Sequence, residues 1–260
     1  MFFFKILYIF YFILICGSCI AKENIENLIY DIQFSNMLVG NVKVKLEKKN
    51  KNISLEIQSM SEGFIDYFYN YKSNIVAISK KEKNKWLPSK YLIKSKYENK
   101  NYSSKVVWND SIDNLKYKLD PPLELKKVHK VLKNTLQNVI DPATALMILI
   151  DNLSEKKSCN KMFKVFDGRR RYNIYLKTIG NVYLEKDRPR SFEGDTIVCG
   201  LKVNPLGGHR LKSKWKPKQD KFEDVKLYFA SYHKYIFLPV RLDISRWFGN
   251  IVVRLLEEKT

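Results

Sequence analysis

Hydrophobic and polar residues alternate with a period of two along most of the chain. Residues 42–46 show this alternation, and residues 53–58 repeat it after the polar turn Asn50-Lys51-Asn52. Alternate side chains of a strand point to opposite faces, and two such runs across a short polar turn are typical of a hairpin. Further runs occur at 29–34, 69–78, 89–97, 102–108, 115–119, 162–166, 172–184, 196–203, 225–231, 237–244 and 251–256. The pattern predicts antiparallel strands with one face in water.

One stretch has the spacing of a helix instead. Asp141 is a favourable N-cap, and Pro142 suits the first helical position, where no backbone N–H is needed. The helix formers of 143–153 follow, and apolar residues recur three and four positions apart on one face. These residues are Leu146, Leu149, Ile150 and Leu153. We expect this face to pack on the sheet, reached through a polar, basic crossing segment at 120–138.

The chain contains no internal repeat and no low-complexity linker. About ten to thirteen strands and one medium helix therefore form a single β-rich domain over residues 22–260. So many antiparallel strands tend to curl. The fold class that we predict is mainly β, a curved antiparallel sheet or open barrel of many strands with one medium α-helix packed on it.

Residues 1–21 have the order of a secretory signal peptide. A single Lys5 precedes an apolar run, and Cys19-Ile20-Ala21 fits the small-residue cleavage pattern. We expect cleavage after Ala21 and a periplasmic or secreted protein. The alternatives are a lipoprotein signal that ends at Cys19 and an uncleaved membrane anchor. No later segment approaches the length of a membrane span.

Cleavage would leave Cys159 and Cys199 as the cysteines of the mature chain. In an oxidising compartment these two can pair. The alternative is a pair of buried thiols. Metal binding by two isolated cysteines lacks further ligands at usable spacing.

The net charge of +20 comes mostly from Lys, which is spread along the chain and often recurs at period two. Such residues are typical of the solvated face of a strand, so we do not infer a nucleic-acid partner. The charge would favour a lipid headgroup or an anionic polysaccharide. The density of Lys and the helix argue against an outer-membrane barrel, whose strands face lipid.

The residues Asp167-Gly168-Arg169-Arg170-Arg171-Tyr172 form the sharpest local motif. Asp-Gly between two strands predicts a hairpin turn. Arg169, Arg170 and Arg171 could bind a carboxylate or phosphate, for which the guanidinium group is well suited. A solvated, charged turn is the simpler interpretation. His209 follows Gly207-Gly208 in a second predicted turn and is a further candidate ligand contact.

The sequence shows no catalytic motif, no P-loop, no dinucleotide fingerprint and no His or Cys at metal-ligand spacing. We therefore expect no cofactor, no metal and no identifiable catalytic set. Scattered carboxylates cannot be paired without geometry.

The second half of the chain resembles an exported bacterial family known as domain of unknown function 3108. The resemblance depends on short pieces in the same order: Asp141 to Leu146, Phe163 to Tyr172, Cys199 with its strand, Gly207-Gly208-His209 and Leu238 to Leu242. It implies a β-rich periplasmic domain with a curved sheet, and it implies that Cys159 and Cys199 form a disulfide. It implies no activity.

Three hypotheses of function follow. The first is a non-enzymatic envelope protein that binds an amphiphile or an acidic envelope polymer in the hollow of its sheet. The second is a hydrolase of an envelope polymer, with His209 and Asp167 as the residues to test. The third is a structural or assembly factor of the cell envelope.

Overall fold

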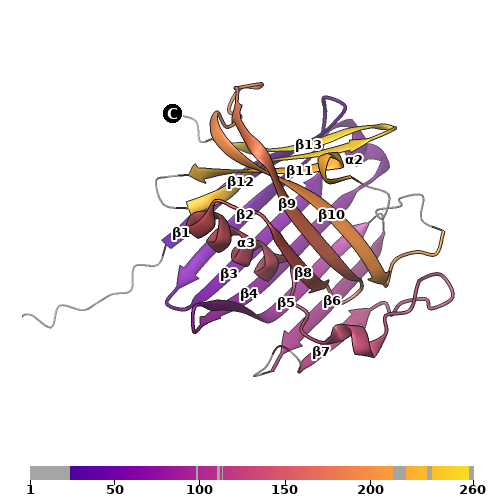
Figure 1. Ribbon diagram of the computed structural model, residues 1–260. Coiled ribbons are helices and arrows are strands. Elements are labelled where there is room, and N and C mark those ends of the chain that lie inside the picture. Colours follow the sequence, from indigo (N-terminus) through magenta and orange to yellow (C-terminus); the bar gives the residue numbers. More distant parts are fainter. Residues whose placement is uncertain are drawn as a thin grey trace, which may run out of the picture.

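A computed structural model describes residues 24–97, 99–109, 112, 114–212, 221–232 and 236–257. Its strands form one 13-stranded antiparallel sheet (Figure 1). The first strands are β1 (Asn24–Phe34), β2 (Met37–Lys49), β3 (Asn52–Ser61), β4 (Tyr71–Glu82), β5 (Lys85–Tyr97), β6 (Lys100–Trp108) and β7 (Leu115–Asp120). The others are β8 (Lys161–Phe166), β9 (Arg171–Leu184), β10 (Gly194–Gly207), β11 (Val225–Tyr232), β12 (Ile236–Arg246) and β13 (Gly249–Leu256). The helices are α2 (Phe64–Phe68) and α3 (Pro142–Lys156), with 3₁₀ turns at Lys133–Leu136 and Phe222–Asp224.

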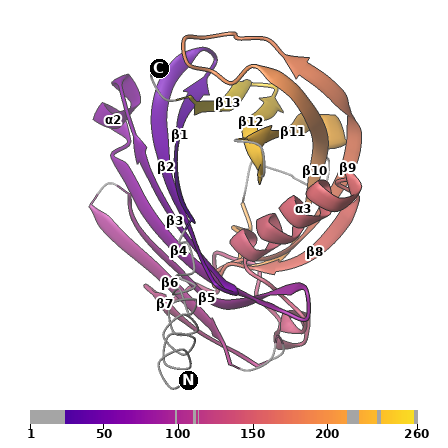
Figure 2. The same cartoon turned by 90° about the vertical axis from the view of Figure 1, so that its left-hand side faces the viewer.

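The sheet consists of two meanders that are joined where β1 pairs with β13. Strands β1 to β7 pair in chain order, as do β8 to β13, and β1 pairs with β13. The sheet curves so that β8 to β10 lie across from β3 to β5, with α3 inside the curve (Figure 2). The predicted fold class is thus confirmed: the protein is a curved antiparallel sheet with one medium helix on it.

The two edge strands, β7 and β8, are not joined by a ladder, and side chains hold this seam instead. Ser104 Oγ on β6 donates to the carbonyl of Asp167 after β8, at 2.9 Å. Trp108 Nε1 donates to the Val139 carbonyl at 3.0 Å, and residue 140 bridges to Val165 of β8. The sheet is therefore open between β7 and β8, and this seam is held by packing and single hydrogen bonds, which leaves space for a cleft.

Helix α3 begins where the sequence predicts. Both Ala143 and Thr144 donate their backbone N–H to the carboxylate of Asp141, at 2.9 Å each. Lys81 Nζ and Trp86 Nε1, from β4 and β5, both donate to Asp151 Oδ2 at 2.6 and 2.8 Å. Buried apolar residues of α3 pack on the concave face of the sheet: Met147, Leu149, Ile150 and Leu153. The helix is thereby capped at its start and attached to β4 and β5 at its middle.

A cross-strand row of apolar residues runs along the concave face near α3. Val44, Ile57, Ile75 and Ile93 are successive register partners on β2 to β5. All four are partly buried and pack against the main core cluster. One row further along the strands, the residues change to polar ones: Ser59, Ser73 and Ser95. The concave face is thus apolar near the helix and polar toward the strand ends.

Cys159 and Cys199 form a disulfide, with their Cα atoms 5.7 Å apart. The bond joins the segment between α3 and β8 to the middle of β10, and both residues are fully buried. The expected pairing is confirmed, and the alternative of two buried thiols is wrong.

Two features differ from the expectation. Residues 64–68 form the short helix α2. The sequence did not predict it, because a single helical turn is too short to show a 3.6-residue period. Strand β10 extends beyond the predicted run at 196–203, since it continues through Pro205 to Gly207 beside β9. The predicted signal peptide, residues 1–21, and His233 lie outside the described residues. Within the described part, no helix is long and apolar enough to cross a membrane.

Candidate functional site

The turn between β8 and β9 is held by one buried carboxylate. Asp167 Oδ1 accepts the backbone N–H groups of Arg169 and Arg170 at 2.9 and 2.7 Å, and Oδ2 accepts Arg170 Nε at 2.9 Å. Gly168 has φ +89°, and a Cβ there would lie 1.8 Å from Ser104 Oγ on β6. The sequence Asp-Gly thus sets a turn that presses directly against the opposite edge of the sheet. The Asp167 carboxylate thus accepts its hydrogen bonds from residues of its own turn.

The three consecutive arginines point to different surroundings. Arg169 Nη2 donates to the carbonyls of Asp120 and Pro121 at 3.1 and 2.8 Å, and its guanidinium lies over the ring of Tyr102. The Arg170 side chain is 59% exposed beside Asp167. Arg171 is buried, and its guanidinium donates to the Thr135 carbonyl at 2.7 Å and to Asn173 Oδ1 at 2.8 Å. Arg169 and Arg170 are available to a cleft, whereas Arg171 joins the sheet to the crossing segment.

His209 lies on the loop that follows β10, and this loop packs on the Asp167 turn. The His129 N–H donates to the His209 carbonyl at 2.9 Å, and the Gly208 N–H donates to the His129 carbonyl at 2.7 Å. The two imidazole rings stack with their centroids 4.4 Å apart. The crossing segment and the Gly-Gly loop therefore form a short two-stranded strap over the turn.

These pieces enclose a polar cleft of about 600 Å³ at the seam of the sheet. Its basic lining is Arg169, Arg170, His209 and Arg210, and its aromatic lining is Tyr71, Tyr91, Tyr102 and Tyr172. Asp167, the acidic residue of this lining, is already paired with Arg170. Burial raises the pKa of Tyr91 and that of Tyr172, so both phenols stay protonated and can donate hydrogen bonds. The cleft offers a positive, hydrogen-bonding and aromatic surface to a ligand.

A second, apolar cavity of about 320 Å³ lies between α3 and the sheet. Leu146, Met147 and Ile150 of α3 form one side, and residues of β1 to β3 and β11 to β13 form the other. The cavity includes Ile57, whose register partners Ile75 and then Ile93 line the polar cleft. Cavity and cleft are thus neighbours along one row of the concave face. The volume is at the lower end of the range of small-molecule sites, about 300–1,000 Å³.

Sequence reasoning found Arg169, Arg170 and His209, which the structure brings to one cleft, and also Arg171, which lies elsewhere. It missed the four tyrosines and Arg210, because these come from separate strands and from the strap. The alternation of Tyr71, Ser73 and Ile75 shows that they share a face but cannot show what they face. Among the described residues, no group of three His, Cys, Asp or Glu side chains could hold a metal ion.

Substitution of Gly208 tests whether close packing of the strap on the Asp167 turn stabilises the fold. Its φ is +80°, and a Cβ would lie 1.8 Å from the Arg169 carbonyl oxygen. We expect Gly208→Ala to displace the strap and to lower the free energy of unfolding by about 2 kcal/mol, as for other strained backbone positions. Gly180→Ala is the matched control: Gly180 also has a positive φ, +156°, but open space surrounds it, so this variant carries backbone strain without the clash and should lose less. Urea unfolding of both variants checks this, and equal losses would contradict it.

No family model, curated protein or solved structure matches this chain.

Proposed function

We propose that the protein is a non-enzymatic binding protein of the cell envelope that holds an anionic amphiphile. The apolar part of the ligand would occupy the cavity beneath α3, and its charged head would lie in the Arg- and Tyr-lined cleft. The observation that carries the proposal is the adjacency of these two spaces, one almost entirely apolar and one basic. Ligand sites are commonly apolar pockets with a few polar groups that fix orientation.

The energetics favour this division of the ligand. Each methylene group that leaves water contributes about 0.8 kcal/mol, so a short alkyl chain in the apolar cavity supplies most of the affinity. Charge-assisted hydrogen bonds from guanidinium groups give specificity for the head group. Arg170 and Arg210 are the best placed for this task, since Arg170 is more than half exposed and Arg210 is exposed. Arg169 is held by the carbonyls of Asp120 and Pro121 and shapes the wall.

A hydrolase is less well supported by the same geometry. Asp167 holds two backbone N–H groups and one guanidinium, so it is committed to the turn. A general base needs hydrogen-bond reach to the proton that it abstracts. We therefore base the proposal on binding.

The test uses two soluble probes with the same alkyl chain, dodecyl phosphate and dodecyl maltoside, below their critical micelle concentrations. Isothermal titration is expected to show tighter binding of the phosphate. In the Arg170→Gln/Arg210→Gln variant, the affinity for dodecyl phosphate is expected to fall roughly tenfold or more, as for lost hydrogen bonds to charged groups. Binding of dodecyl maltoside should stay the same.

Two further variants separate the head group from the tail. Leu146→Trp fills the cavity from the α3 side and should weaken both probes. Lys105→Gln/Lys118→Gln removes the same charge from the opposite face of β6 and β7, where the two residues are register partners, and should change neither. An acidic polysaccharide in the cleft alone would bind normally to Leu146→Trp. Absence of binding of either probe, with nothing extracted from the purified protein in mass spectrometry, would overturn the proposal.

A further inference from the structure

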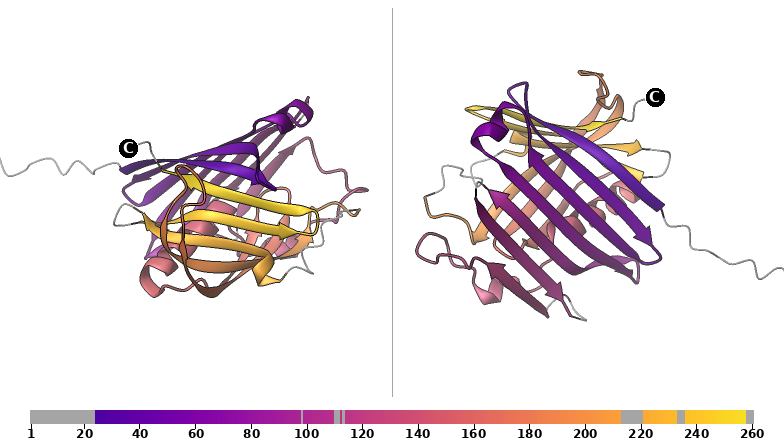
Figure 3. Two further views of the ribbon diagram at one scale, coloured as in Figure 1. Left: turned by 90° about the horizontal axis from the view of Figure 1, so that it is seen from above. Right: turned by 180° about the vertical axis from the view of Figure 1, so that it is seen from behind.

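One end of the sheet exposes an unusual number of large apolar side chains. The β1–β2 turn, α2 and the β12–β13 turn meet at this end (Figure 1, upper right; Figure 3, right panel, upper left). We call these exposed residues the aromatic rim: Met37, Leu38, Phe64, Tyr67, Phe68, Tyr69, Tyr71, Tyr97, Trp247 and Phe248. Single exposed apolar residues are normal, but a group at one end marks an interaction surface.

Contacts between its parts make the rim continuous. The Glu62 N–H, next to α2, donates to the Val39 carbonyl of β2 at 3.0 Å. On the other side of the β1–β2 turn, the rings of Phe34 and Phe248 have centroids 6.4 Å apart. Tyr69 and Tyr97 stack with their centroids 6.3 Å apart, which extends the surface to the end of β5. The β1–β2 turn, α2 and the β12–β13 turn therefore form one continuous surface.

The tips of the rim are more exposed than a fold needs for its own stability. Trp247 is 95% exposed, Tyr67 is 89% exposed and Phe64 is 77% exposed. These rings lie on turns and on a one-turn helix, so they project beyond the strand ends. Trp and Tyr are the side chains that settle at the boundary between lipid headgroups and acyl chains.

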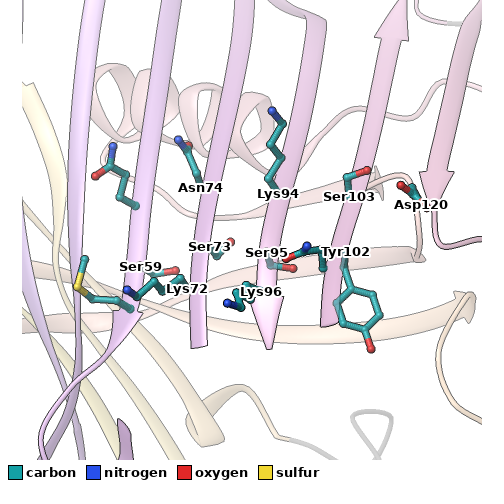
Figure 4. Close-up of a pocket in the computed structure, with 13 residues that line it drawn as sticks. Ser59, Lys72, Ser73, Asn74, Lys94, Ser95, Lys96, Tyr102, Ser103 and Asp120 are labelled. Atoms are coloured by element: carbon teal, nitrogen blue, oxygen red, sulfur yellow. The ribbon is translucent and has the colours of Figure 1, made fainter. Parts of the chain in front are cut away.

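Basic side chains lie directly beside the rim. A shallow groove of about 480 Å³ crosses β3 to β6 near the same strand ends, and Lys72, Lys94 and Lys96 line it (Figure 4). The groove lining also includes Asp120, and two carboxylates lie at α2: Glu62, which accepts from Asn41, and Asp66, which accepts from Ser61. The positive charge of this end is therefore that of the lysines in the groove, beside the projecting aromatic rings.

We propose that the aromatic rim docks this protein on the surface of a lipid bilayer that contains anionic lipids. The rings would enter the headgroup region, and the lysines of the groove would attract the negative surface. Charge complementarity favours this partner over a second copy of the chain, because two chains of net charge +20 repel each other. Tyr71 belongs both to the rim and to the polar cleft, so the docked face is the one beside the cleft.

Flotation with vesicles tests this proposal independently of any ligand. The purified protein is first shown by intact mass spectrometry to lack residues 1–21, since an apolar leader would itself bind vesicles. We expect binding to phosphatidylcholine vesicles that contain phosphatidylglycerol and much weaker binding to pure phosphatidylcholine. Phe64→Ala/Tyr67→Ala/Trp247→Ala should lower the partition coefficient roughly tenfold or more, because three large apolar groups stay in water.

Leu132→Ala/Met162→Ala/Tyr175→Ala is the matched control, since it removes exposed apolar groups away from the rim and should bind as the parent does. Lys72→Gln/Lys96→Gln should lower binding to anionic vesicles alone. Equal binding of the rim and control variants would overturn the proposal. Equal binding to vesicles with and without anionic lipid would also overturn it. Sedimentation that shows a dimer lost in the rim variant would instead assign the rim to self-association. Titration with dodecyl phosphate in the absence of vesicles stays unchanged in the rim variant if the two proposals are independent.

Discussion

Replacing both Cys159 and Cys199 with Ser is expected to lower the free energy of unfolding by about 3–4 kcal/mol. The bond closes a loop of 40 residues, and in the chain-entropy model the unfolded ensemble gains this freedom when the cross-link is removed. The loop contains β8 and β9, so the loss falls on the side of the sheet that lacks a ladder to β7. Urea unfolding of the double variant, followed by the fluorescence of the buried Trp86 and Trp108, measures it.

The reduced wild-type protein is the control for packing at the two sites. With dithiothreitol it keeps both sulfur atoms in the core but loses the cross-link, so it should lose most of the same free energy. A reduced protein as stable as the oxidised one would assign the effect of the double variant to Ser burial and would contradict the entropic account. Dodecyl phosphate should still bind to the folded fraction, because neither cysteine lines the cavity or the cleft.

The disulfide and α3 explain together how an unclosed sheet can keep a defined cavity. On one side, Asp151 of α3 is bound by Lys81 and Trp86 of the first meander. On the other side, the chain after α3 is bonded through Cys159 to β10 of the second meander. The helix therefore acts as a brace between the two halves, and the apolar cavity lies on the side of this brace nearest β1 and β13.

Local patterns were sufficient to predict most of the fold. Alternation with period two located the strands because each has one face on the core, as in residues 42–46. Asp141 and Pro142 marked the start of α3 because their preference is a property of the backbone at that position. The disulfide was predicted from the resemblance and from the presence of two cysteines after the predicted signal peptide.

The candidate site could be predicted only in part, because it depends on contacts between distant segments. Arg169 and Arg171 are indistinguishable in the sequence, yet one lies over Tyr102 and the other donates to Thr135. The difference arises because Arg169 lies in the turn after Gly168, whereas Arg171 is the first residue of β9; within one strand, residues two apart would share a face. The tyrosines that line the cleft could not be predicted without knowing which strands lie opposite the turn. Neighbours in one cross-strand row come from different strands and are therefore far apart in the sequence.

Asp141→Asn is expected to change the pH dependence of stability more than any other single substitution of a carboxylate in the described chain. Burial raises the pKa of Asp141 from 3.8 to about 6, against the hydrogen bonds from Thr144 and Ala143 that lower it. A raised pKa means that the folded state binds the proton more tightly than the unfolded state. The stability from this group is therefore complete below about pH 4 and is lost as the pH rises to about 6.

The shift of about two pKa units corresponds to about 3 kcal/mol. Asn can still cap the helix but does not titrate. We expect the wild type to be the more stable protein at pH 4 and to lose about 3 kcal/mol relative to Asp141→Asn by pH 7, measured by urea unfolding across this range. Thr144→Val removes a hydroxyl that donates to Asp141 and should move the transition to higher pH. A difference between wild type and Asp141→Asn that is constant with pH would show that Asp141 has the same pKa in the folded and unfolded protein, and would contradict the raised pKa.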